Sequence, residues 1–148
     1  MSALNNGEKW ITSSGRVSDF TLKETECKCG CGYNEIKQNL INTLQMIRDT
    51  LGTPIKINCA LRCPSHNKST GGADNSFHIQ GMAADIAVKD INSDKDIPSE
   101  LLYDAIKLIQ IPAVIMYPGH FFCHIDVRKT SYPVRLKKSG GFYIPVEY

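Results

Sequence analysis

The chain has 148 residues, the length of one ordinary domain, and its 17 Lys and Arg against 15 Asp and Glu leave a net charge of +2. This near-balance argues against a dedicated nucleic-acid-binding protein, because the surface of such a protein is normally strongly basic. Apolar residues make up 42% and charged residues 22% of the chain, which is the composition of a globular protein rather than a disordered one.

The sequence shows neither a membrane-spanning segment nor a secretory signal. A membrane helix requires a run of about 18 apolar residues, and the chain contains no such run. Residues 1–16 lack the basic start and the apolar block of a secretory signal. We therefore expect a soluble protein with no membrane span.

From residue 36 the pattern predicts a helix, a strand and a loop in succession. Apolar residues at three- and four-residue steps predict an amphipathic helix over 36–51, which ends at Gly52. The alternating, β-rich segment 55–59 predicts a strand. Residues 60–76 are rich in Pro, Gly and Asn and predict a long ordered loop, a kind of segment that often carries function.

The second half of the chain predicts further strands and a second helix. The helix is expected to turn Leu101, Ala105 and Leu108 to one side. Pro118–Gly119 predicts the turn of a hairpin between two neighbouring strands. The elements expected here are strands over 83–88, 113–117, 121–127 and 142–146, and a helix that begins near residue 97.

These elements predict an α+β fold in a single domain, 1–148, with a small antiparallel sheet flanked by helices. Within it we distinguish an N-terminal segment that contains cysteines (1–35), a core that bears the motifs (36–130) and a basic tail with the last strand (131–148). After Asp126 the chain carries five basic residues against Glu147 alone. We interpret this charge as a solvated face, with attraction to an anionic polymer as the alternative.

Three of the four histidines stand near acidic residues, in two blocks of the sequence. Two imidazoles and one carboxylate are the three-ligand pattern of catalytic zinc, with a fourth position open for water. A single buried histidine is usually a core residue, but two such blocks favour a metal site. Their members are His78 and Asp85 in the first block, and His120, His124 and Asp126 in the second.

Strand geometry helps to choose among the residues of the second block. On a strand, His120, His124 and Asp126 would share one face because side chains alternate. At about 3.3 Å per residue, Asp126 lies roughly 6.6 Å from His124, and His120 lies roughly 13 Å from it. We therefore take His124 as the ligand and Asp126 as a residue able to orient it. His120 could overhang the site if the chain bends at Gly119.

Several separated motifs resemble those of one family. Ser76-x-His78-x-x-Gly81-x-Ala83-x-Asp85 is followed by His124-Ile-Asp126-Val-Arg128. Upstream, Ile57-Asn-Cys-Ala-Leu-Arg62-Cys-Pro64-Ser-His-Asn67 precedes Gly71-Gly72-Ala73. In order and residue type these motifs resemble the zinc D-Ala-D-Ala carboxypeptidases and their Hedgehog-type relatives, over residues 36–130.

The resemblance implies a Hedgehog/DD-peptidase-like fold and one catalytic Zn²⁺ ion held by His78, Asp85 and His124. It also implies that Arg62 faces the substrate, where a guanidinium can hold a terminal carboxylate or a developing oxyanion. Ser76 is expected either to hydrogen-bond near the metal, where it would contact the substrate, or to shape the turn.

The catalytic base is the point at which the sequence departs from part of the family. Many relatives carry a glutamate shortly before the last histidine ligand, where this chain has Phe121-Phe122-Cys123. Other members use a histidine upstream of that ligand, which points to His120. Asp126 is the rival candidate for the base.

The implied activity is that of a zinc metallopeptidase that hydrolyses a D-amino-acid-containing bond in bacterial peptidoglycan, with D-alanyl-D-alanine carboxypeptidase as the leading choice. One alternative is a peptidoglycan endopeptidase such as a phage-type endolysin. Another is a non-catalytic, zinc-binding, Hedgehog-like interaction module. The expected partner is a cell-wall peptide, the expected state is a monomer, and the wall would be reached from the periplasm, from outside the cell or by phage or virus delivery.

The six cysteines allow three interpretations. A structural zinc site at Cys27, Cys29 and Cys31 is the least favoured, because such sites usually show paired C-x-x-C spacing. Disulfides from this cluster to Cys59 or Cys63 would suit an exported protein, whereas reduced thiols would suit a cytosolic one.

Overall fold

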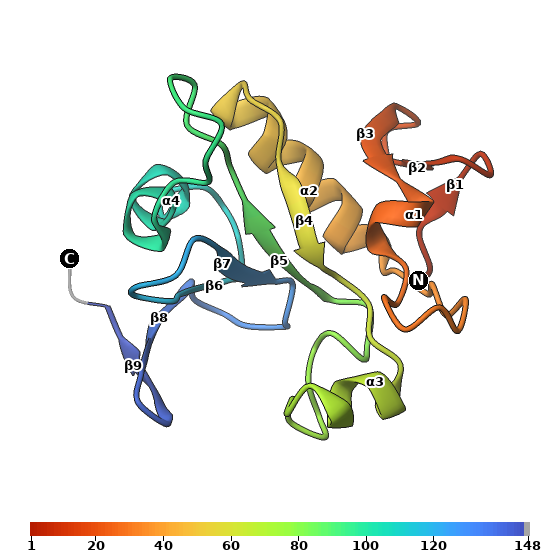
Figure 1. The fold of residues 1–148 in the computed structure, drawn as a ribbon. Helices are drawn as coiled ribbons and strands as arrows, with labels where there is room; N and C mark the ends of the chain where they lie inside the picture. Colours follow the sequence, from red (N-terminus) through yellow and green to blue (C-terminus); the bar gives the residue numbers. More distant parts are fainter. Residues whose placement is uncertain (147–148) are drawn as a thin grey trace.

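The computed structural model describes residues 1–146, which contain two β-sheets and four helices (Figure 1). The α+β class is therefore confirmed. Residues 147–148 of the predicted tail, with the charge of Glu147, lie outside the described residues. In chain order the elements are β1 (Leu4–Asn5), β2 (Lys9–Ile11), β3 (Val17–Thr21), α1 (Leu22–Thr25), α2 (Gln38–Leu51), β4 (Lys56–Cys59), α3 (Pro64–Ser69), β5 (Ala83–Ala87), α4 (Ser99–Ile106), β6 (Ala113–Met116), β7 (Cys123–Asp126), β8 (Val134–Ser139) and β9 (Phe142–Pro145).

The main sheet has six strands in the order β4-β5-β7-β6-β8-β9, and β1–β3 form a separate N-terminal sheet. All neighbours in the main sheet are antiparallel except β6 and β8, which run parallel. The predicted antiparallel sheet thus contains one parallel pair. We did not predict β8 or the N-terminal sheet. Basic residues obscure the alternation of β8, β1 and β2 are too short to show a period, and in β3 the polar Ser18 is one of the buried residues.

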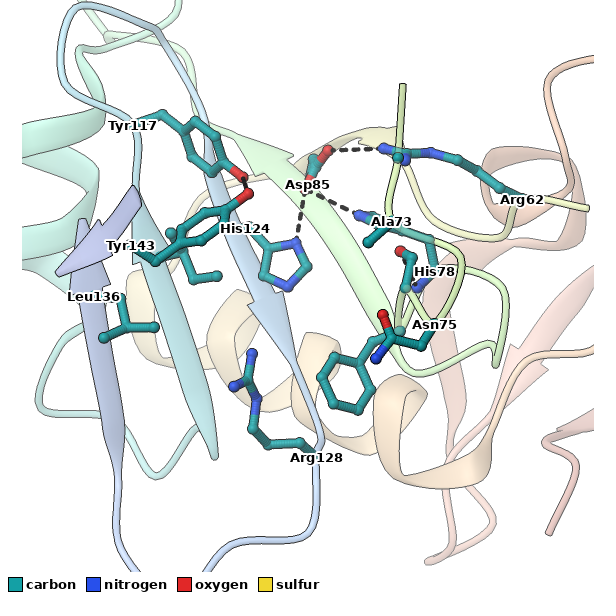
Figure 2. A pocket seen from close by; sticks show the side chains of 14 residues that line it. Arg62, Ala73, Asn75, His78, Asp85, Tyr117, His124, Arg128, Leu136 and Tyr143 are labelled. Atoms are coloured by element: carbon teal, nitrogen blue, oxygen red, sulfur yellow. Dashed lines mark hydrogen bonds and ion pairs between the residues drawn. The ribbon is translucent and has the colours of Figure 1, made fainter. Parts of the chain in front are cut away.

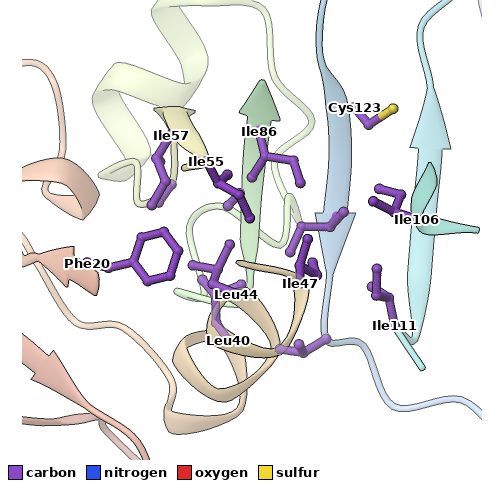
Figure 3. Packing of buried hydrophobic residues seen from close by; sticks show 14 of the residues in the cluster. Phe20, Leu40, Leu44, Ile47, Ile55, Ile57, Ile86, Ile106, Ile111 and Cys123 are labelled. Atoms are coloured by element: carbon purple, nitrogen blue, oxygen red, sulfur yellow. The ribbon is translucent and has the colours of Figure 1, made fainter. Parts of the chain in front are cut away.

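Helix α2 covers one face of the main sheet and forms the centre of the hydrophobic core (Figure 3). Its residues Leu40, Leu44 and Ile47 are fully buried among the inward-facing residues of the strands, which include Ile57 and Ile86. Full burial of such a side chain contributes about 1.5–3 kcal/mol, so this face sets the position of the helix on the sheet. The predicted end of the helix is confirmed at Gly52, whose φ is 67°.

The opposite face of the sheet carries a row of aligned side chains. The register pairs Asp85 with His124, His124 with Ile115, and Ile115 with Leu136, across β5, β7, β6 and β8. Because side chains alternate along each strand, residues in this row point away from the face that α2 covers. The row therefore lies where a site can form outside the core.

Part of the predicted loop 60–76 is helical. Cys63 is the N-cap of α3, with its Sγ accepting a hydrogen bond from the backbone N–H of His66 at 3.4 Å, and Pro64 occupies the first helical position. Proline at this position is typical of a helix start, because it has no N–H to leave unpaired. We missed this signal because the Pro- and Asn-rich composition resembles a loop.

Helix α4 begins at Ser99, but the side that we predicted for it is wrong. Leu101 is 57% exposed, Ala105 is exposed, and Leu108 is 86% exposed beyond the helix end. Apolar residues occur on both sides of this short helix, so their spacing alone does not indicate which side is buried. The core-facing residues are Leu102, Tyr103 and Ile106.

The basic tail is not simply a solvated face. Arg135 in β8 is only 6% exposed, and its guanidinium donates hydrogen bonds to the backbone oxygens of Lys107, Ile109 and Ile111. This arginine therefore joins the last strands to the end of α4. Within residues 1–146, none of the helices combines the length and apolar character needed to cross a membrane.

Gly81 links the turn that carries His78 to the strand that carries Asp85, and we predict that it tolerates no side chain. Its φ is +70°, and an added Cβ would lie 2.0 Å from the backbone oxygen of Glu35. Gly81→Ala should lower the free energy of unfolding by at least about 3 kcal/mol, through backbone strain and overpacking together. Urea denaturation followed by circular dichroism measures the loss.

Gly7→Ala is the matched control for this substitution. Gly7 has a φ of +91°, and an added Cβ would meet nothing within 4 Å. This variant should lose about 1–2 kcal/mol, from strain alone. Equal losses in the two variants would show that the contact with Glu35 has no effect.

Candidate metal centre

The three predicted ligands lie close together, two of them in the row on the open face of the sheet (Figure 2). His78 lies on the turn before β5, while Asp85 and His124 face each other across β5 and β7. Asp85 Oδ1 lies 3.4 Å from His78 Nε2 and 3.2 Å from His124 Nδ1. Tetrahedral zinc with ligand bonds of about 2.0–2.1 Å requires ligand atoms about 3.3–3.4 Å apart. The three residues therefore fit a zinc ion.

The other nitrogen of each histidine ring has a fixed partner. His78 Nδ1 lies 2.6 Å from the backbone oxygen of Ala60, and His124 Nε2 lies 2.8 Å from Asp126 Oδ2. When these nitrogens donate their protons to the oxygens, the nitrogens that face Asp85 keep their lone pairs. Histidines that bind metals in proteins usually show this arrangement. Both rings are therefore held in the tautomer that zinc requires.

The charges of the cluster suit a bound cation. Burial lowers the pKa of His78, but the hydrogen bonds and charges of Asp85 and Cys59 outweigh burial and raise this pKa to about 9. Burial also opposes the ionisation of Asp85, yet the two histidines hold the pKa of its carboxyl well below the usual range. The pKa of His124 is raised as well, against the effect of burial, by the hydrogen bonds to Asp126 and Asp85. Without metal these shifts favour protons on the two rings, and a metal ion would compete with those protons.

Asp126 lies behind His124 and is fully buried. Besides its contact with His124, it accepts two hydrogen bonds from the Arg128 guanidinium, from Nε to Oδ1 and from Nη2 to Oδ2, each at 2.7 Å. Burial raises the pKa of Asp126, but Arg128 and His124 outweigh it and lower the pKa, so the carboxylate is ionised at neutral pH. Both oxygens are occupied, which suits the orientation of His124 better than proton transfer to a substrate.

His120 lies apart from the three ligands. The predicted strand over 121–127 begins only at Cys123, so His120 is not on a strand. It lies in an exposed turn, where its backbone N–H donates to the backbone oxygen of Tyr117 at 3.0 Å. Its ring packs against Tyr117 and Phe122, with centroids 6.3 and 5.9 Å away. His120 is not among the residues that line the pocket at the metal centre.

Arg62 reaches the metal centre from the segment between β4 and α3. Its Nε donates to Cys59 Sγ at 3.2 Å and its Nη1 to Asn67 Oδ1 at 3.1 Å, while Nη2 lies 3.8 Å from Asp85 Oδ2. A Cβ on Gly72 would lie 2.2 Å from Asn67 Oδ1, so a side chain there would displace the amide that accepts from Arg62. The guanidinium is therefore held in one position next to the ligands.

Ser76 shapes the turn of His78 and also lines the pocket. Its Oγ accepts a hydrogen bond from the backbone N–H of His78 at 3.2 Å. The backbone oxygen of His78 in turn accepts from the N–H of Arg62 at 3.2 Å. This short network joins the metal ligand to the arginine.

The pocket over the metal centre has a volume of about 330 Å³ (Figure 2). Among the lining residues that we did not predict as site residues are Arg128, Tyr117 and Tyr143. The hydroxyls of Tyr117 and Tyr143 lie 3.4 Å apart at the pocket wall. The hydrogen bond with Tyr117 lowers the pKa of Tyr143, assisted by Lys138. Arg128 could have been suspected from its motif, but Tyr143 lies on β9 in the tail and carries no signal in the sequence.

A sequence model of one family, described as Peptidase M15, matches residues 16–126. The chain belongs to the Peptidase M15 family. The predicted family is confirmed, and the matched range includes Arg62 and all three predicted zinc ligands. Membership makes the chain a zinc-dependent metallopeptidase and supports peptidoglycan peptides as its substrates. No curated protein matches the chain.

Zinc retention tests the ligand assignment in this M15 peptidase. His78→Ala and Asp85→Ala should each lose one equivalent of zinc relative to the parent chain, because each removes a ligand atom. Asp126→Asn keeps all ligands but should weaken zinc binding by about 10- to 100-fold, because it disturbs the orientation of His124. Zinc content by mass spectrometry and competition with a chelator measure these effects.

Asp96→Asn is the control for the change of charge, because Asp96 pairs with Lys56 at the surface. It should bind zinc as the parent does. Unchanged zinc content in His78→Ala would show that His78 is not a ligand.

Proposed function

We propose that the chain hydrolyses a D-amino-acid-containing bond in bacterial peptidoglycan peptides and acts as a D-alanyl-D-alanine carboxypeptidase. The position of Arg62 carries this proposal. Its guanidinium lines the same pocket as the zinc ligands and lies 3.8 Å from Asp85. A fixed cation beside the ligands is suited to hold the terminal carboxylate of a peptide whose last bond is cleaved.

The residues of the pocket have distinct roles in this proposal. Zinc held by His78, Asp85 and His124 would supply a Lewis acid that acidifies water and polarises the scissile carbonyl. Arg62 has five N–H donors, and its bonds to Cys59 and Asn67 leave others for a substrate carboxylate.

Two tyrosine hydroxyls complete the proposed substrate site. Tyr117 and Tyr143 lie at the wall of the pocket, where their O–H groups can hydrogen-bond the peptide backbone of a substrate. Ser76, which also lines the pocket, can bind the substrate through its hydroxyl.

We propose His120 as the base that accepts the proton during hydrolysis. Asp126 is fully buried, and Arg128 and His124 occupy its oxygens, which disfavours it in this role. The exposed ring of His120 packs against Tyr117, which itself lines the pocket. A movement of the turn that holds both residues would bring the imidazole towards a bound peptide.

His120→Ala should retain zinc but lower kcat by about 10²- to 10⁴-fold, the usual contribution of a general base. His66→Ala is the control, because His66 lies on α3 and does not line the pocket. Turnover of a pentapeptide at saturating substrate, with zinc content measured in parallel, makes the comparison. A near-normal kcat in His120→Ala would remove His120 from this role.

The choice between carboxypeptidase and endopeptidase depends on what Arg62 binds. A wall pentapeptide that ends in D-Ala-D-Ala should be cleaved at least about 30-fold faster as the free acid than as the C-terminal amide, the ratio that corresponds to a charged contact of 2 kcal/mol. Arg62→Ala should abolish this preference. Arg16→Ala, which affects an exposed pair with Asp49, should preserve it.

The other outcomes identify the alternative functions. Equal cleavage of acid and amide, together with cleavage of cross-links in purified peptidoglycan, would indicate an endopeptidase or endolysin. Zinc bound at the histidine site without cleavage of any wall peptide would indicate a non-catalytic binding module.

A further inference from the structure

Four cysteines from two distant parts of the chain form a second cluster of metal-ligating side chains. Cys27, Cys29 and Cys31 follow α1, and Cys63 caps α3. Their four sulfur atoms lie within 4.8 Å of one another. All six cysteines, which belong to the described part of the chain, are free thiols. The C-x-C-x-C run thus supplies three ligand atoms, and the fold supplies the fourth.

The spacing of the sulfur atoms matches a tetrahedral metal site. Cys29 Sγ lies 3.4 Å from Cys27 Sγ and 3.7 Å from Cys63 Sγ. A zinc ion with four Zn–S bonds of about 2.3 Å requires sulfur atoms about 3.8 Å apart. Little movement of the cysteines would therefore be needed to bind such an ion.

Backbone N–H groups point at three of the four sulfur atoms. Cys27 Sγ accepts from the N–H of Cys63 at 3.3 Å, and Cys63 Sγ accepts from the N–H of His66 at 3.4 Å. Cys31 Sγ accepts from the N–H of Tyr33 at 3.5 Å. Such hydrogen bonds stabilise the negative charge of metal-binding thiolates.

The chain between the ligands turns sharply, which allows three sulfur atoms to converge. Gly30 and Gly32 have φ values of +83° and +81°, a conformation that other residues rarely adopt. Each glycine follows one of the cysteines of the run. The N–H groups and the two glycines thus hold the four sulfur atoms close together.

We propose that Cys27, Cys29, Cys31 and Cys63 bind one structural zinc ion, separate from the ion of the peptidase site. Four thiolates in tetrahedral arrangement are typical of structural zinc, whose coordination is complete without water. Four S–H bonds give up their protons to solvent as four Zn–S bonds form. Paired C-x-x-C spacing, whose absence from the sequence disfavoured such a site, is not required here. The fourth ligand, Cys63, is distant in the sequence and is brought to the cluster by the folding of the chain.

The ion would fasten the N-terminal segment to the loop of Arg62. Cys63 follows Arg62 directly in the chain, and the N–H of Leu61 donates to the backbone oxygen of Thr25 at 3.1 Å. The proposed zinc site lies at the next contact between the same two segments. Its role is structural, so it does not depend on the proposed peptidase activity.

Zinc stoichiometry in a protein without the peptidase ion tests this proposal. The His78→Ala/His124→Ala double variant, purified with reductant and without chelator, should contain one zinc per chain. Adding Cys63→Ser should reduce this to none, while α3 keeps its cap because serine is a good N-cap residue. Adding Cys123→Ser instead should leave one zinc, because Cys123 lies against Ser99 and outside the cluster.

A second measurement avoids substitutions in the cluster. The double-histidine variant loaded with Co²⁺ should show the strong near-ultraviolet sulfur-to-cobalt absorption of a tetrathiolate site, and a mercurial reagent should release the metal as four thiols react. Three results would overturn the proposal. The double variant could contain no zinc, its zinc content could stay unchanged after Cys63→Ser, or these four cysteines could form disulfides in place of the ion. None of these results would bear on the ligands proposed for the peptidase site.

Discussion

The pairing of Asp85 with His124 across β5 and β7 is the constraint on which the site depends. A shift of one residue in this register would turn every side chain of a strand to the other face of the sheet. The shift is opposed by the core, because Ile86 and Ile125, the neighbours of these two residues, are fully buried. Burial of apolar side chains on one face therefore positions the predicted metal ligands Asp85 and His124 on the other.

Charge compensation explains how this face can hold two aspartates. Asp126 is fully buried, and an unpaired carboxylate there would be costly. Arg128 binds it through two parallel hydrogen bonds, and Arg62 lies beside Asp85. The same guanidinium groups line the pocket, so the cations that make the site tolerable also make it attractive to an anionic group of a substrate.

Segments from the N-terminal and C-terminal parts of the described chain lie on opposite sides of the central strands (Figure 1). β9 is held at the edge of the sheet by β8, and it brings Tyr143 to within 3.4 Å of Tyr117. At the other end, Thr25 at the end of α1 accepts a hydrogen bond from the N–H of Leu61, and Cys27 accepts one from the N–H of Cys63. The motif-bearing core thus supplies the predicted metal ligands, while the flanking segments support and complete the pocket.

Much of the site could be predicted from local patterns, and the remainder could not. The predicted zinc ligands stand in two short motifs. Hydrophobic periodicity predicted the helix over 36–51, which is observed over Gln38–Leu51, and the strand that bears Asp85. The buried side of α4 was predicted wrongly, because apolar residues on both sides of a short helix make the period ambiguous. The helix after Cys63 was missed because loop-like composition concealed its cap.

The sequence by itself determined the chemical types present, the family, the α+β class and the motifs around His78, Asp85 and His124. Only the tertiary structure decided which distant residues join them. The row that includes Leu136, and the meeting of Cys63 with Cys27, depend on strand order and on the path of loops. Local periodicity reports which face of an element is buried, but it contains no information about which other segment packs beside it.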